Sequence, residues 1–321
     1  MSAAAPGPLA DLLQLLELES LEVNLFRGAS RDIGSPQVFG GQVLGQALRA
    51  AYATVQDRQV HSLHAYFLRR GDFRAPIVYQ VDRSRDGGSF SSRRVVAIQH
   101  GEQIFHMAAS FQQAEQGLEH QVTMPDVPAP ESLPDLREMI EAQSASLPPA
   151  VQRFSGRNSP FEFRAVQTVN YLHPVPQPPR FDVWFRTAGA VDGDALRHAC
   201  LLAYVSDYHL IATAMLPHGY TMASPGIVVA SIDHAMWFHR PLRVDQWLLC
   251  SMDSPVAAGG RGFARASIFQ RDGVLVASTA QEGLIRVLPE TPAAGEAPVG
   301  MAPADKPEAP PAQGAANAEK N

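Results

Sequence analysis

Three polar side chains in the second half of the chain have the types needed to hold and activate a water molecule for hydrolysis. They are the carboxylate of Asp207, the hydroxyl of Ser231 and the carboxamide of Gln281. A carboxylate can accept a proton from water, while a hydroxyl and an amide can orient that water. The corresponding positions of the first half carry Val55, His61 and Ala109. Only one half of the chain therefore has a complete set.

This correspondence comes from an internal repeat. The segment His64-Ala-Tyr-Phe-Leu-Arg-Arg-Gly71 resembles His234-Ala-Met-Trp-Phe-His-Arg-Pro241. In each half this segment is followed by a glycine turn, an arginine (Arg93 or Arg265), a second glycine turn (Gly101 or Gly273) and an apolar strand. Repeats of this length predict one architecture made twice and packed against itself.

Three separate matches place the candidate residues. Matching His64 with His234 puts His61 opposite Ser231. Matching Gly101 with Gly273 puts Ala109 opposite Gln281. Matching Ala51-Tyr52 with Ala203-Tyr204 puts Val55 opposite Asp207.

The elements that must position these residues follow an α+β pattern, in which a helix precedes a series of antiparallel strands. Leucines at helical spacing predict a short opening helix over residues 9–16, and the small and apolar residues 39–52 predict a helix buried on most faces. Alternating or apolar stretches predict strands at 21–26, 62–67, 77–83, 91–99 and 103–111. In the second half, strands are expected at 161–169, at 181–187 and from 228 onward, with a helix over 195–210.

Composition divides the chain into four parts. Residues 1–112 form the first repeat, and residues 113–159 are a proline-rich connector with a short helix near 136–142. Residues 160–289 form the second repeat. Residues 290–321 consist largely of Ala, Pro, Gly and Glu without an aromatic residue, which predicts a disordered tail.

The composition excludes several classes of protein. The chain has 321 residues, of which 45% are hydrophobic, and its net charge is -6, which does not favour nucleic-acid binding. Its two cysteines, Cys200 and Cys250, lie in apolar runs and are expected to be buried thiols. The sequence shows neither a basic signal peptide nor an apolar run of about 20 residues, so we expect a cytoplasmic protein without membrane insertion.

Familiar catalytic and ligand-binding signatures are absent from the sequence. It contains no Gly-x-Ser-x-Gly, His-Glu-x-x-His or Cys-x-x-Cys. The glycine-rich stretch that starts at Gly40 lacks the lysine and hydroxyl of a phosphate loop. Its glycines are instead expected to let a helix begin close to other backbone. The free amides at this helix start could face an anion or a carbonyl oxygen. The histidine spacings do not converge on one face of a strand, so we expect no metal site.

Longer motifs carry a resemblance to a known family. They are Phe39-Gly-Gly-Gln-Val-Leu-Gly-Gln-Ala-Leu48, Val60-His-Ser-Leu-His-Ala-Tyr-Phe-Leu-Arg69, Ser206-Asp207-Tyr, Ala230-Ser-Ile-Asp-His-Ala-Met-Trp-Phe-His-Arg-Pro241 and Asp272-Gly-Val-Leu-Val-Ala-Ser-Thr-Ala-Gln-Glu-Gly283. Together they resemble the bacterial acyl-CoA thioesterase II family, the TesB type, over about residues 12–286.

The resemblance implies a double hotdog fold, in which each repeat wraps an antiparallel sheet around a central helix. It also implies hydrolysis of acyl-CoA to fatty acid and CoA, with Asp207, Ser231 and Gln281 as the catalytic residues. We expect the acyl chain to lie in an apolar channel beside the helices. Asp207 would accept the proton, and the other two would orient the water. No cofactor is implied, and a homo-oligomer, either a dimer or a tetramer, is expected.

Several alternatives remain open. Taken singly, Asp207, Ser231 and Gln281 are ordinary capping or strand residues, and His61, a second-tier candidate, equally fits a hydrogen-bonded core histidine. The rival functions are a hotdog enoyl-CoA hydratase, a non-catalytic acyl-CoA-binding protein, and a serine hydrolase built from Ser231, Asp233 and His234. The last is disfavoured because neighbouring residues of a strand point to opposite faces.

Overall fold

The first repeat is built from helices and antiparallel strands. The computed structural model describes residues 7–35, 37–143 and 159–288. The elements up to residue 112 are α1 (Pro8–Leu16), β1 (Glu19–Glu22), β2 (Leu25–Gly28), α2 (Gly40–Tyr52), β3 (Gln59–Phe67), β4 (Ile77–Asp86), β5 (Phe90–Gln99) and β6 (Glu102–Gln112). The single strand expected over 21–26 is wrong, because the chain turns there into a hairpin with Asn24 at a φ of 62°.

The second repeat follows the same plan. The described elements after residue 112 are η1 (Pro130–Ser132), α3 (Leu136–Gln143), β7 (Phe161–Ala165), β8 (Arg180–Thr187), α5 (Ala195–Val205), α6 (Leu210–Met215), η3 (Leu216–His218), β9 (Ile227–Ser231), β10 (Asp233–Phe238), β11 (Leu248–Ala258), β12 (Arg261–Gln270) and β13 (Leu275–Val287). The tail expected over 290–321 and part of the connector lie outside the described residues.

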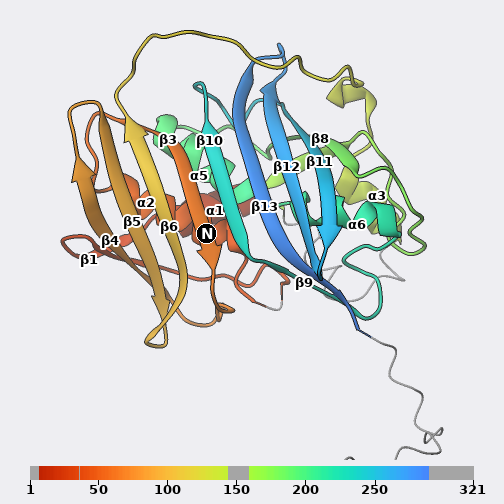
Figure 1. Cartoon of the computed structure of the whole chain (residues 1–321), viewed down its shortest axis with the longest axis horizontal. Helices are drawn as coiled ribbons and strands as arrows, with labels where there is room; N and C mark the ends of the chain where they lie inside the picture. Colours follow the sequence, from red (N-terminus) through yellow and green to blue (C-terminus); the bar gives the residue numbers. More distant parts are fainter. Residues whose placement is uncertain (1–6, 36, 144–158, 289–321) are drawn as a thin grey trace, which may run out of the picture. The chain divides into compact units, whose positions relative to one another are not determined.

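One continuous sheet joins the two repeats. Its 13 described strands run in the order β1-β2-β4-β5-β6-β3-β10-β13-β12-β11-β8-β7, with β9 also paired to β13. The junction is the antiparallel pair β3 and β10, and helices α2 and α5 lie on one face of the sheet (Figure 1). Both central helices therefore pack against the same face of one sheet.

The central helices pack against each other through small residues. Most of α2 is buried, including Leu44 and Leu48, which are fully buried. A Cβ at Gly41 would overlap the carbonyl oxygen of Tyr204, the penultimate residue of α5. Glycine at this position is therefore required for the two helices to approach, as expected for the glycines at the start of this helix.

The helix expected over 195–210 is wrong at its end. Helix α5 stops at Val205, and α6 begins only at Leu210. Between them His209 has a φ of 68°, a left-handed conformation that a right-handed helix cannot contain. Asp207 consequently lies in an irregular turn between two helices.

The segment Ala195–His218 is long and apolar enough to cross a membrane, which contradicts the prediction that no such segment is present. However, 72% of its most apolar window is buried inside the fold. Burial of this kind is what a core helix requires. Both cysteines are free and buried.

Candidate active site

Asp207, Ser231 and Gln281 lie within hydrogen-bonding distance of one another. The Nε2 group of Gln281 donates to Oδ1 of Asp207 at 2.6 Å and to Oγ of Ser231 at 3.2 Å. The hydroxyl of Ser231 lies 3.5 Å from the same Asp207 oxygen. Both amide hydrogens of Gln281 are therefore used inside this cluster.

Three different elements bring these residues together. Asp207 lies in the turn between α5 and α6, Ser231 ends β9, and Gln281 lies on β13. Strands β9 and β13 are paired, with Ser231 opposite Gly283. Gln281 is 1% exposed and points to the face of the sheet that carries the helices, opposite the small side chain of Ala264. The small partner leaves room for the amide.

The first repeat contributes a backbone group to this cluster. The N–H of Gly41, in the first turn of α2, donates to Oδ2 of Asp207 at 2.9 Å. The positive end of the helix dipole therefore faces the carboxylate. The sequence predicts anion-facing amides at this helix start but not that Asp207 is their partner, because the two residues are 166 positions apart.

Burial dominates the electrostatics of Asp207. Removal of its carboxylate from water raises its pKa to about 6, and the hydrogen bonds from Gln281, Gly41 and Ser231 oppose this rise. A carboxylate with this pKa is ionised at neutral pH yet retains affinity for a proton. Such a group is suited to act as a general base near pH 7.

One acceptor of the cluster lacks a partner within residues 7–35, 37–143 and 159–288. The Oε1 atom of Gln281 is buried without a hydrogen bond to any described residue. A buried carbonyl oxygen of this kind normally has a partner, in the protein or in water. It can therefore accept a hydrogen bond from a water or a ligand beside Asp207.

His61 has a different set of contacts. Its Nε2 lies 2.8 Å from the hydroxyl of Ser110, its ring lies edge-on to Phe90, and burial lowers its pKa. Neither Ser110 nor Phe90 belongs to the cluster. These contacts are those of a hydrogen-bonded strand histidine.

The match of His64 with His234 is wrong by one residue. In the sheet His234 lies opposite Ala65, and His64 lies opposite Ala235, so the two histidines point to opposite faces. His234 is 1% exposed, whereas His64 is exposed. A slip of one residue reverses the face of every side chain in a strand.

The counterpart of Ser231 changes as a result. With Ala109 matched to Gln281, Phe111 matches Gly283. Val60 lies opposite Phe111, just as Ser231 lies opposite Gly283. Val60, and not His61, therefore occupies the position of Ser231 in the first repeat.

A Ser231–His234–Asp233 triad is not formed. The carboxylate of Asp233 accepts a hydrogen bond from the backbone N–H of Glu282 at 2.6 Å. His234 contacts the hydroxyls of Ser206 and Thr279 through Nε2. Neither side chain is bonded to Ser231, so the serine-hydrolase alternative lacks its geometry.

The structure also shows a surface groove away from the cluster. A groove of about 740 Å³ lies beside α1, lined by residues that include Asp11, Glu17 and Arg31 but none of the three clustered residues. Its charged walls differ from the apolar channel expected for an acyl chain.

Among residues 7–35, 37–143 and 159–288, no group of three His, Cys, Asp or Glu side chains could hold a metal ion.

Both repeats match family models. Residues 28–112 match the model described as the acyl-CoA thioesterase N-terminal domain. Residues 127–285 match the model described as the acyl-CoA thioesterase C-terminal domain.

Similar proteins extend over almost the same part of the chain. Acyl-CoA thioesterase 2 of Haemophilus influenzae is 46% identical over 279 residues, which cover 87% of this chain and 98% of that protein. Human acyl-coenzyme A thioesterase 8 is 42% identical over 296 residues, covering 89% of this chain and 92% of that protein.

Solved structures share the fold. The acyl-CoA thioesterase II TesB2 of Mycobacterium marinum superposes with a TM-score of 0.72 at 43% identity, covering 86% of this chain and 98% of its own. A hotdog-fold protein of unknown function from Alicyclobacillus acidocaldarius superposes with a TM-score of 0.69 at 19% identity, covering 86% of this chain and 98% of its own. The fold is the expected α+β double hotdog, and the chain belongs to the acyl-CoA thioesterase family.

Proposed function

We propose that this protein hydrolyses acyl-CoA thioesters to a free fatty acid and CoA, using a water activated by Asp207, Ser231 and Gln281. The supporting observation is the hydrogen-bonded cluster of these three side chains around a half-buried carboxylate. The names of the relatives, which are acyl-CoA thioesterases, favour the same substrate class.

In the proposed reaction, Asp207 accepts a proton as the water oxygen attacks the thioester carbonyl carbon. Ser231 and Gln281 orient the water. The Oε1 of Gln281, which has no partner in the described part of the chain, accepts the second hydrogen of the water. The tetrahedral intermediate then collapses with cleavage of the carbon–sulfur bond. The proton held by Asp207 passes to the departing CoA thiolate, which leaves a fatty acid and free CoA thiol.

The negative charge that develops on the carbonyl oxygen needs fixed hydrogen-bond donors. The first turn of α2 supplies backbone N–H groups next to Asp207, and Gly41 already uses its own for the carboxylate. We assign the role of oxyanion donor to the N–H of Gly40, since those of Gln42 and Val43 donate to the carbonyl oxygen of Phe39. No cofactor takes part in these steps.

A thiol-release assay tests the proposal directly. Purified protein is incubated with short, medium and long acyl-CoA substrates, and free CoA thiol is measured over time. We expect turnover with at least one chain length. Loss of enoyl absorbance without release of thiol would identify a hydratase instead, and saturable binding without turnover at any length would identify an acyl-CoA-binding protein.

Domain organisation and assembly are part of the same proposal. We propose that the repeats at 1–112 and 160–289 act as one unit, in which the first supports the reactive groups of the second. The expected cytoplasmic homo-oligomer, a dimer or a tetramer, stays a prediction. Sedimentation velocity that detects only monomer would contradict it.

A further inference from the structure

A buried hydrogen-bond chain connects the end of α5 to the sheet. The hydroxyl of Ser206, the residue before Asp207, donates to the carbonyl oxygen of Ala203 at 3.0 Å and lies 3.0 Å from Nε2 of His234. The same nitrogen lies 3.0 Å from the hydroxyl of Thr279, which donates to the carbonyl oxygen of Ala235 at 2.9 Å. Ser206, His234 and Thr279 are all buried.

This geometry defines the state of the imidazole. Each hydroxyl has a single hydrogen, which it donates to a backbone carbonyl, so we infer that His234 donates through Nε2–H to both oxygens. Its Nδ1 has no partner among the described residues. Burial also lowers the pKa of His234 to about 3. The ring is therefore a neutral donor shared by a helix-end serine and a strand threonine.

The chain ends beside two of the clustered residues. Ser206 directly precedes Asp207, and Thr279 precedes Gln281 by two positions on β13, so that both side chains point to the same face of the sheet. We propose that His234 is a positioning residue that holds Asp207 in register with Gln281 through Ser206 and Thr279. This role rests on the proposed hydrolase function.

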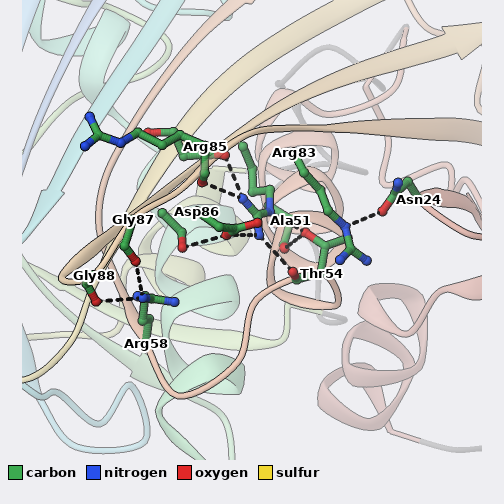
Figure 2. A network of polar contacts seen from close by, with 12 residues as sticks. Asn24, Ala51, Thr54, Arg58, Arg83, Arg85, Asp86, Gly87 and Gly88 are labelled. Atoms are coloured by element: carbon green, nitrogen blue, oxygen red, sulfur yellow. Dashed lines mark hydrogen bonds and ion pairs between the residues drawn. The ribbon is translucent and has the colours of Figure 1, made fainter.

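The first repeat contains the same helix-end anchor with a different donor. The hydroxyl of Thr54 donates to the carbonyl oxygen of Ala51 at 2.8 Å, as Ser206 does to Ala203. It accepts a hydrogen bond from Nε of Arg93 at 2.8 Å, in the network around Thr54, Ala51 and Asp86 in Figure 2. The next residue is Val55, which has no reactive group. Thr54 therefore provides a matched control with the same hydroxyl-to-carbonyl bond and no carboxylate at the next position.

The test compares kcat, KM and thermal unfolding among matched variants. We expect Ser206→Ala to lower kcat by about tenfold or more with KM changed by less than about twofold, because small displacements of a reacting group reduce turnover strongly. Ser206→Ala and Thr54→Ala should lower the unfolding temperature by similar amounts. Thr54→Ala should nevertheless leave kcat within about twofold of wild type.

The donor itself is tested by two substitutions. His234→Leu removes the N–H and should reproduce the kcat loss of Ser206→Ala. His234→Gln supplies two amide hydrogens for the two hydroxyls and should bring kcat back to within about threefold of wild type. If His234→Leu does not fold, Ser206→Ala, which deletes a single oxygen, still decides the question.

A non-additivity test separates positioning from a general structural effect. In an Asp207→Asn background, Ser206→Ala should cause no further loss, because the two residues act as one unit. An unchanged kcat in Ser206→Ala, an equal kcat loss in Thr54→Ala, or a further loss in the double variant would each overturn the proposal. Absence of thiol release by the wild-type protein would refute the hydrolase function and this role with it.

Discussion

The substitution Asp207→Asn should abolish most activity while making the protein more stable at alkaline pH. The asparagine keeps the size of the aspartate but cannot accept a proton from water. Removal of a general base typically lowers turnover by about 10² to 10⁴-fold. The stability gain is the less obvious consequence, and it follows from the raised pKa of Asp207.

The magnitude follows from linkage between protonation and folding. The folded pKa of Asp207 is about 6, compared with 3.8 for a free aspartate, so the folded state binds more protons than the unfolded chain between these values. Stability is therefore lost as pH rises through about 4 to 6, and the ionised carboxylate costs about 3 kcal/mol above this window. A neutral asparagine avoids this cost.

Part of the gain is offset by a lost hydrogen bond. Oδ2 of Asp207 accepts from the N–H of Gly41, and Oδ1 accepts from Gln281. An asparagine has only one acceptor oxygen, so one of these donors loses its partner at a cost of about 1 kcal/mol. The net gain is about 2 kcal/mol at pH 8, or about 4 °C in the unfolding temperature. At pH 4 the gain should vanish.

The assay combines thermal unfolding from pH 4 to pH 8 with thiol release over the same range. The wild-type rate should reach a plateau above pH 7 and fall to about a tenth of it at pH 5, since Asp207 must be ionised to accept a proton. Activity of Asp207→Asn near the wild-type level would refute the proposed base. A variant that is less stable than wild type at pH 8 would refute the account of its electrostatics.

Three further predictions concern other residues of the two repeats. Ser231→Ala and Gln281→Met should each lower kcat in the thiol-release assay by about 10 to 100-fold without loss of fold, and wild-type rates in either would remove that residue from the mechanism. Gly41→Ala should destabilise the fold by about 2 kcal/mol, because the new Cβ overlaps the carbonyl oxygen of Tyr204. It should also move the acidic limb of the rate profile to higher pH, because Asp207 loses a hydrogen-bond donor and its pKa rises. Arg93→Met should lower the unfolding temperature, because Arg93 is 2% exposed and bonded to Thr54 just after the end of α2, while kcat stays within about twofold. A large kcat loss would contradict a purely structural role for Arg93.

The sequence by itself determined most of the elements. Small and apolar residues over 39–52 predicted α2, and alternation between glycine turns predicted strands β3 to β6, with ends that differ by a few residues from those in the structure. The turns at Gly101 and Gly273 have φ values of 78° and 89°, which is why they matched across the repeats and gave Gln281 its correct counterpart. These features depend on local periodicity and on backbone conformations that glycine adopts readily.

Tertiary structure decided the register and the end of α5. A one-residue slip leaves the sequence pattern of β3 and β10 almost unchanged, yet it reverses the faces of His64 and His234. The apolar run after Ala195 favours a continuous helix. It is interrupted because His209 is left-handed and Ser206 is anchored to the sheet.

The candidate site combines both levels. Asp207, Ser231 and Gln281 were selected from the sequence, by comparison of the two repeats and by resemblance to a family. Their proximity, the N–H of Gly41 and the burial that raises the pKa of Asp207 depend on segments up to 166 residues apart. Electrostatic environment is a property of packed neighbours, so only the folded chain determines how readily this carboxylate takes a proton.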